Sequence, residues 1–137
     1  FKDIKLEHHK KKGLSLILVD AGHLSVILHN LISNALKFTP EGKLIQLDYE
    51  QQPDYLTLKI IDEGTGMSAE KLQEIKSNQE QILSKVGTAL ETGTGLGLMV
   101  VKQFLELNEA TFEIESIPGK GSTFFVSFKI APPDTDL

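Results

Sequence analysis

The order of hydrophobic and polar residues predicts a chain of alternating strands and helices. Apolar residues recur at helical spacing in two segments, Ser68 marks the start of a third, shorter helix, and five further segments have the pattern of strands. The predicted strands cover residues 14–19, 43–50, 55–61, 111–116 and 122–130. The predicted helices cover residues 21–38, 69–76 and 96–107. This order favours an α/β two-layer sandwich, in which a five-stranded mixed sheet carries three helices on one face.

Local signals support these boundaries. Asp20 is a good N-cap for the first helix, and Pro40 with Gly42 ends it. Residues 77–92 show no clear periodicity, and a loop of that length inside a compact domain is usually functional or mobile.

Composition narrows the class of protein. With 137 residues, 40% of them hydrophobic and 24% charged, the chain has the size and content of one globular domain. The absence of cysteine excludes disulfides, thiolate zinc sites and cysteine nucleophiles, and the net charge of −5 argues against a nucleic-acid surface. We expect a linker remnant at residues 1–13, one domain at 14–131 and a tail at 132–137, as in a module cut from a longer protein.

Three polar side chains group on one edge of the first helix. Asn30, Asn34 and Lys37 follow each other at spacings of four and three, beside a broad apolar arc. They could offer an amide oxygen to a hard cation and positive charge to a phosphate, although a polar helix rim is the simpler alternative. Two asparagines in mid-helix need a reason, because asparagine has poor helix propensity.

A carboxylate leaves the third predicted strand and enters a glycine turn. Asp62 is followed by Gly64 and Gly66. The carboxylate could accept a hydrogen bond from a ligand amine, and the glycines would let the backbone approach a flat ring. Alone, the motif is equally typical of an ordinary turn.

Two further glycine-rich segments follow. Gly93, Gly95 and Gly97 open the last helix, where free backbone N–H groups favour an anion, or where the glycines simply form a hinge. The spacing fits neither a dinucleotide-binding fingerprint nor a P-loop. Residues 119–123 alone indicate a hairpin turn.

Together and in this order, the four segments resemble the N box and the three glycine boxes of the catalytic and ATP-binding domain of sensor histidine kinases. That family belongs to the GHKL superfamily, which includes gyrase-type topoisomerases, mismatch-repair ATPases and certain chaperones. The resemblance covers roughly residues 14–130 and implies the Bergerat-type ATP-binding fold. It departs from the family where residues 71–81 contain no phenylalanine, so the usual F box is missing.

The resemblance implies roles for the first helix. Asn34 would give its side-chain oxygen to Mg²⁺, and Asn30 would lie close to the phosphates of ATP. Lys37 would pair with phosphate oxygens, while Phe38 would pack near the adenine.

It also implies roles for the glycine segments. Asp62 would accept a hydrogen bond from the adenine amino group, Gly66 would let the ring approach, and Thr123 would support the adenine through Asp62 or a water. The glycines before the last helix would offer N–H groups, and Lys76 or Lys85 is the candidate cation of the intervening lid. The implied ATP-binding set is Asn30, Asn34, Lys37, Phe38, Asp62, Gly64, Gly66, Met67, Lys85, Thr92, Gly93, Thr94, Gly95, Leu96, Gly97, Leu98 and Thr123.

As a function, the resemblance implies a domain that binds Mg·ATP and donates the γ-phosphate to a histidine on a separate helical dimerisation domain. No histidine here lies in the His-Glu-x-x-x-Pro context of such phosphoacceptors, so we expect ATP binding without autophosphorylation. The partners would be that dimerisation domain and a response-regulator receiver domain. The ATP-binding domain itself would contact neither nucleic acid nor a membrane. It would be the cytoplasmic part of a larger, membrane-anchored sensor. The alternatives are another ATPase of the same fold, an anti-sigma-type serine kinase, and an interaction module that has lost ATP.

Overall fold

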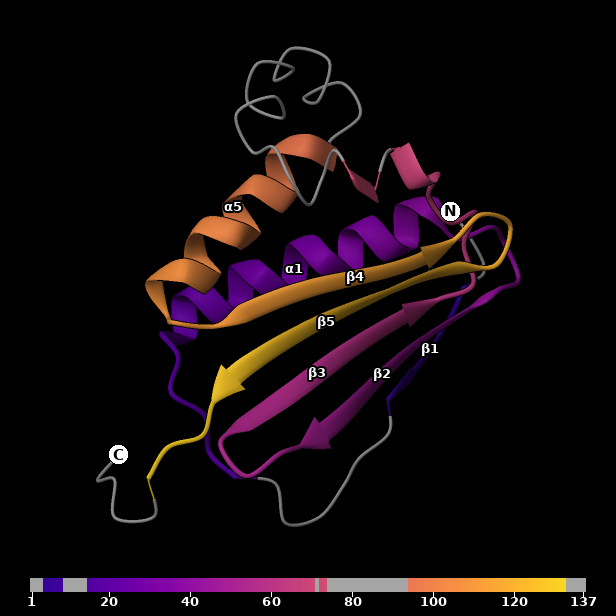
Figure 1. Ribbon diagram of the computed structural model, residues 1–137. Coiled ribbons are helices and arrows are strands. Elements are labelled where there is room, and N and C mark those ends of the chain that lie inside the picture. The colour runs from indigo at the N-terminus through magenta and orange to yellow at the C-terminus, as the bar shows by residue number, and fades with distance from the viewer. Residues whose placement is uncertain (1–3, 9–14, 71, 74–93, 133–137) are drawn as a thin grey trace.

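A computed structural model describes residues 4–8, 15–70, 72–73 and 94–132. Figure 1 shows two layers, with a twisted sheet below and helices packed against one of its faces. The strands are β1 (Lys5–His8), β2 (Leu44–Gln51), β3 (Tyr55–Asp62), β4 (Thr111–Ile117) and β5 (Gly121–Lys129). The helices are α1 (Ala21–Phe38) and α5 (Thr94–Leu107).

The sheet has the order β1-β2-β3-β5-β4. β1 runs parallel to β2, and every other neighbouring pair is antiparallel. Burial alternates along β3 and β5, so one face of the sheet packs against the helices and the other faces outward. The core between the layers includes Ile27 and Leu31 of α1, Val101 and Leu105 of α5, and Ile60 of β3.

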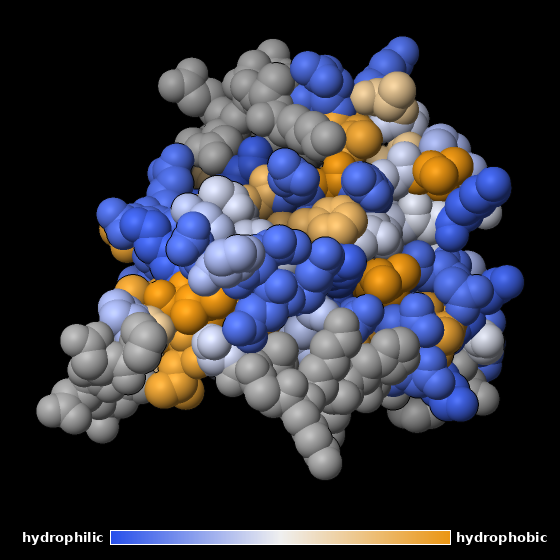
Figure 2. Space-filling view, turned by 60° about the horizontal axis from the view of Figure 1, so that its bottom comes forward, coloured by the Kyte–Doolittle hydropathy of each residue, from blue (hydrophilic) through white to orange (hydrophobic). Residues whose placement is uncertain are grey.

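The outward face of the sheet is mainly polar, as the predominance of blue in Figure 2 shows. Lys59 of β3 forms an ion pair with Glu50 of β2 at 2.9 Å, and its Nζ lies 5.9 Å from the ring centroid of Phe125. This face therefore needs no second layer of helices to cover it.

The two helices are fastened together where α1 begins and α5 ends. Asp20 caps α1 by accepting a hydrogen bond from the backbone N–H of His23 at 2.9 Å, as its position in the sequence predicted. The side chain of Asn108, just after α5, accepts from Asp20 N at 2.8 Å and donates to Phe104 O at 2.6 Å. The same amide nitrogen lies 2.9 Å from His23 Nδ1, and the His23 ring stacks on Phe104 at 4.3 Å between centroids.

One predicted strand is wrong. Residues 14–19 were expected to form a buried strand, but the described part of this segment makes only an isolated bridge between Ile17 and Ile130. Leu16 and Leu18 remain 63% and 40% exposed, so the apolar run does not mark a buried strand here. The other four predicted strands are present, with ends shifted by at most one residue.

The strand at the edge of the sheet lies instead in the segment expected to be a linker. Lys5–His8 pairs with β2, and Glu7 accepts a hydrogen bond from Gln46 at 3.4 Å. An edge strand has a neighbour on one side only, so a polar sequence can form it and leaves no hydrophobic pattern to detect. The expected linker at residues 1–13 is therefore wrong for these four residues.

The third predicted helix is described only in part. Ala69, Glu70, Leu72 and Gln73 are helical, and Leu72 N donates to Ser68 O at 3.0 Å. Residues 71 and 74–93 lie outside the described residues, so the rest of that helix and the loop at 77–92 stay predictions. Within the described part of the chain, no helix is long and apolar enough to cross a bilayer.

Candidate functional site

The candidate site centres on a buried carboxylate at the end of β3. Asp62 is only 6% exposed, and its Oδ1 accepts hydrogen bonds from Gly64 N at 2.9 Å and Ser122 N at 3.2 Å. Burial raises the pKa of Asp62, and these two N–H groups oppose that rise because they stabilise the ionised form. Within the described residues both hydrogen bonds end on Oδ1, so Oδ2 is the oxygen that can serve a ligand.

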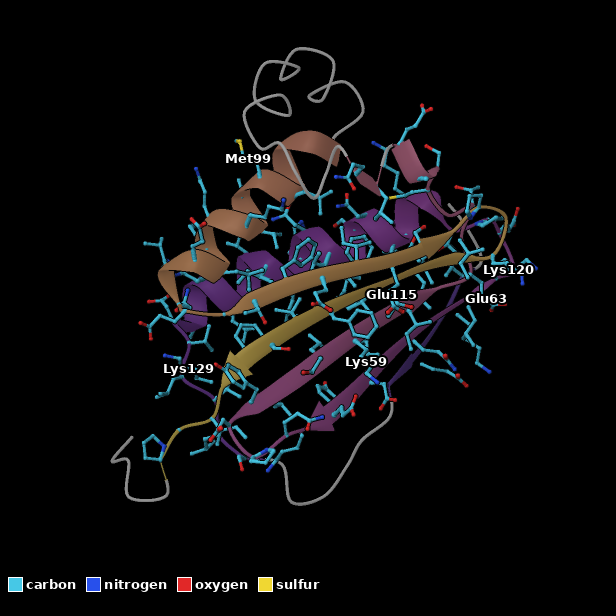
Figure 3. All side chains as sticks on the ribbon, viewed as in Figure 1. Lys59, Glu63, Met99, Glu115, Lys120 and Lys129 are labelled. Carbon is cyan, nitrogen blue, oxygen red and sulfur yellow. The ribbon has the colours of Figure 1, made fainter. Side chains whose placement is uncertain are left out.

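The loop after Asp62 is bound to the turn between β4 and β5. Gly119 N donates to Thr65 O at 2.7 Å, and Met67 N donates to the Oγ of Ser116 at 2.7 Å. Figure 1 shows the end of β3, this turn and the last residues of α1 at the same end of the molecule. Figure 3 places Glu63 and Lys120 there as well, with Lys129 at the opposite end of the sheet.

Two glycines allow this close approach of backbone to backbone. Gly66 has φ +72°, and a Cβ on it would lie 2.2 Å from the carbonyl oxygen of Ile117. Gly121 has φ +126°, and a Cβ there would lie 2.1 Å from the carbonyl oxygen of Asp62. A side chain would clash with the backbone at both positions. Glycine is therefore required at Gly66 by the packing of the protein itself, whether or not an adenine ring approaches it as predicted.

The three polar residues predicted on one edge of α1 differ in their contacts and in their exposure to solvent. Asn30 donates from Nδ2 to Val26 O at 2.8 Å within its own helix, and its Oδ1 would be 2.9 Å from a Cβ on Gly97. Asn30 therefore lies where the start of α5 crosses α1. Asn34, one turn further along, is 7% exposed, whereas Lys37 is exposed in the last turn of the helix.

The side chains of the site can be compared with the ligands that a divalent cation requires. The described residues contain no cluster of three or more His, Cys, Asp or Glu side chains that could hold a metal ion. Mg²⁺ usually keeps several waters and binds through one or two protein oxygens together with substrate phosphates. The Asn34 side chain fits that mode, in which the phosphates supply most of the negative charge.

A groove at the other end of the sheet contains none of the predicted site residues. It has a volume of about 570 Å³ and is lined by Ser15, Leu16, Pro53, Asp54, Ile130, Ala131 and Pro132. Figure 2 shows apolar side chains at the lower left, over this end of the molecule. The groove adjoins the turn before β3, whereas Asp62 is the last residue of that strand.

Comparison with known proteins decides the family. Residues 19–132 match the model of the histidine kinase-, DNA gyrase B-, and HSP90-like ATPase family. The chain belongs to this ATPase family. The matched range contains the four motif segments, and the family predicted from those segments is confirmed.

Relatives of this ATPase domain include much longer sensor kinases. The sensor histidine kinase TmoS of Ectopseudomonas mendocina is 37% identical over 117 residues, which are 85% of this chain and 12% of that protein. The autoinducer 2 sensor kinase/phosphatase LuxQ of Vibrio vulnificus (strain YJ016) is 35% identical over 135 residues, covering 94% of this chain and 16% of LuxQ. The ATPase domain thus spans less than a fifth of either relative.

Solved structures agree on the fold. The crystal structure of full-length ShkA in complex with AMPPNP matches 93% of this chain and 26% of ShkA, with a TM-score of 0.74 and 26% identity. The mycobacterial sensor histidine kinase MprB matches 95% of this chain and 84% of that structure, with a TM-score of 0.72. At 21% identity, MprB supports the fold alone. The α/β fold with antiparallel strands and helices on one face is therefore the fold of a histidine kinase ATPase domain.

Of the two routes predicted for Thr123, through Asp62 or through a water, the structure does not bring the Thr123 side chain to Asp62, and the route through a water stays a prediction. Thr123 pairs with Ile61 on the outward face of the sheet, while the Asp62 side chain lies on the face covered by the helices. Ser122 is the residue opposite Asp62, and its N–H makes the hydrogen bond. The alternation of buried residues along β5 could have revealed this, because Ser122 shares its face with Phe124.

Ser116 is not among the residues predicted for the site, although its Oγ accepts a hydrogen bond from Met67 N in the loop after Asp62. Gly121 belongs to the third glycine segment but has no predicted role of its own, although its backbone lies against the carbonyl oxygen of Asp62. Among the predicted residues, Leu98 lies in the hydrophobic core and Met67 packs against it. Several others lie wholly or in part outside the described residues. Lys85, Thr92 and Gly93 are not described at all, and of Phe38, Thr94, Gly95 and Leu96 only the helical backbone is.

Proposed function

We propose that the chain is the ATP-binding catalytic domain of a two-component sensor histidine kinase. It binds Mg·ATP and donates the γ-phosphate to a histidine on a separate dimerisation domain. The observation that carries this proposal is the Asp62 carboxylate, which is buried and held by two N–H groups on Oδ1. The AMPPNP complex of the structural neighbour ShkA supports a nucleotide as the ligand.

The chemistry of the site follows from its groups. Oδ2 of Asp62 accepts a hydrogen bond from the exocyclic amine of adenine, which a guanine base would not offer in the same place. Asn34 provides an oxygen for Mg²⁺, which when bound neutralises charge on the phosphates. Lys37 adds positive charge at the exposed end of α1, and the N–H groups at the start of α5 favour an anion.

Further partners belong to the same proposal. The relatives TmoS and LuxQ are sensor kinases many times longer than this domain, so the dimerisation domain would be another part of the same protein. A response-regulator receiver domain would take the phosphate from the histidine. We expect the domain to act on the cytoplasmic side of a larger, membrane-anchored sensor.

Calorimetric titration of ADP and ATP with Mg²⁺ tests the proposal. Asp62→Asn should weaken ADP binding at least about tenfold, because it replaces a charged acceptor whose hydrogen bonds are worth roughly 1.5–3 kcal/mol. Asp48→Asn is the matched control, since it makes the same change of charge on the outward face of β2. No binding by the unmodified protein, or equal loss in both variants, would contradict the proposal.

Radiolabelled ATP separates the kinase from its alternatives. We expect the chain to bind ATP and to acquire no label, because none of its histidines lies in the phosphoacceptor context. Rapid ATP turnover by the isolated domain would favour an ATPase of the same family, and label on serine would favour a serine kinase.

A further inference from the structure

Ser116, on β4, connects the elements that meet behind the Asp62 carboxylate. Its Oγ accepts a hydrogen bond from Met67 N at 2.7 Å and lies 2.8 Å from Ser122 Oγ. It also donates to the carbonyl oxygen of Gly121 at 3.3 Å. Because a hydroxyl has a single proton, Ser122 donates to Ser116 whenever Ser116 donates to Gly121.

These bonds hold the loop against β5. Met67 ends the glycine loop that begins at Asp62, whereas Gly121 and Ser122 open β5. The backbone N–H of Ser122 is one of the two groups bound to Oδ1 of Asp62, and Gly64, inside the loop, supplies the other. Ser116 therefore bonds to both sides of the cradle that orients the carboxylate, without touching the carboxylate itself.

The location of Ser116 explains why a hydroxyl is needed. The loop lies so close to the β4–β5 turn that a Cβ on Gly66 would meet the Ile117 carbonyl oxygen at 2.2 Å. Ser116 precedes Ile117, and its short side chain reaches the Met67 N–H across this narrow gap. An alanine would leave that N–H without its protein partner, and an unmade hydrogen bond costs more than the made bond contributes.

We propose that Ser116 is a positioning residue for base recognition: by bonding Met67, Ser122 and Gly121 at once, it keeps Oδ1 of Asp62 on its two N–H donors and Oδ2 aimed at the amine of the base. This inference rests on the proposed function, because it presumes that Asp62 recognises an adenine base. It adds a residue that contacts neither the carboxylate nor the ligand.

The test compares two ligands that differ only in the exocyclic amine. ADP carries the amine, and the 5′-diphosphate of purine riboside lacks it. Ser116→Ala should weaken ADP binding about tenfold while changing the binding of the amine-free ligand less than about twofold. Ser116→Thr keeps the hydroxyl and should restore the preference for ADP.

Ser127→Ala is the matched control. Ser127 lies on the same strand as Ser122, and its hydroxyl lies 2.7 Å from that of Thr57, so this variant also loses a hydroxyl pair within the sheet. It should leave the ratio of the two affinities unchanged. If Ser116→Ala does not fold, Ser122→Ala removes the same hydroxyl pair from the other side and should reduce the ratio in the same direction.

The outcomes separate the two proposals. Equal weakening of both ligands by Ser116→Ala, or an unchanged ratio in Ser122→Ala, would overturn the positioning role and leave the proposed function intact. Equal affinity of the unmodified protein for both ligands, or no binding of ADP, would refute base recognition by Asp62 and the positioning role with it.

Discussion

Replacing Gly66 by alanine should disrupt the loop that carries the site. The residue has φ +72°, where an L-residue is disfavoured by about 1–2 kcal/mol. The new Cβ would also lie 2.2 Å from the Ile117 carbonyl oxygen and 3.0 Å from Pro118 Cα, so the loop must move away from the turn. The contact cannot be relieved by a side-chain rotation, because the neighbouring atoms belong to the backbone.

The size of the expected loss in stability follows from the hydrogen bonds that this movement of the loop would break. Two hydrogen bonds join the loop to β4 and its turn, from Gly119 N to Thr65 O and from Met67 N to Ser116 Oγ, both at 2.7 Å. Each contributes about 1 kcal/mol net, so together with the backbone term we expect a loss of roughly 3–4 kcal/mol in the free energy of unfolding. For a domain of this size that corresponds to a fall in Tm of about 10–15 °C.

Urea unfolding followed by circular dichroism measures this loss, and two other glycines provide controls. Gly42 and Gly119 have φ +81° and +80°, yet a Cβ on either meets nothing within 4 Å. Their alanine variants should therefore lose only the backbone term of about 1–2 kcal/mol. If Gly66→Ala is no more destabilising than these controls, the close packing of the loop on the turn is refuted.

Three further predictions concern charge and helix packing. Burial raises the pKa of Asp62 above its ordinary value of 3.8, so the folded protein binds this proton more tightly than the unfolded chain does. The free energy of unfolding should then fall as the pH rises from the pKa of Asp62 in the unfolded chain to its higher pKa in the folded protein. Asp62→Asn should therefore stabilise the ligand-free protein at neutral pH. Urea unfolding at about pH 4 and about pH 7 checks both expectations. Asn108→Ala removes the hydrogen bonds that fasten α1 to α5 and should cost about 1–3 kcal/mol in the same assay; a change below about 0.5 kcal/mol would contradict their role. Lys129→Ala removes an exposed ion pair with Glu109 and should leave the urea midpoint nearly unchanged, because water screens an exposed pair; a clear fall in the midpoint would contradict that view.

The sequence predicts the parts of this protein whose signals are local. The cap at Asp20 and the helical spacing after it place α1 from Ala21 to Phe38. The carboxylate of Asp62 is likewise marked by its position between an apolar strand and two glycines. Each of these features depends on residues close together in the chain, so it can be read without knowledge of the fold.

What the sequence does not predict depends on contacts between distant segments. β1 is a polar edge strand, and its pairing with β2 joins residues about forty positions apart, as Lys5 and Leu44 do. The sequence points to Thr123 as a support of the adenine site, through Asp62 or a water, but the register places Ser122 opposite Asp62, and in a strand a shift of one residue moves a side chain to the opposite face. The role of Ser116 requires β4, β5 and the glycine loop to be placed together before it becomes visible.

Recognition of adenine by Asp62 is tested by an ADP titration monitored by amide NMR, which locates the ligand as well as detecting it. We expect shifts for the N–H groups of Gly64, Met67 and Ser122 around the carboxylate, with Tyr55 and Ser127 at the far end of the sheet unaffected. Addition of GDP at the same concentration should leave all of these signals nearly unchanged. Shifts confined to the far end of the sheet, or equal shifts with ADP and GDP, would contradict recognition of adenine by Asp62.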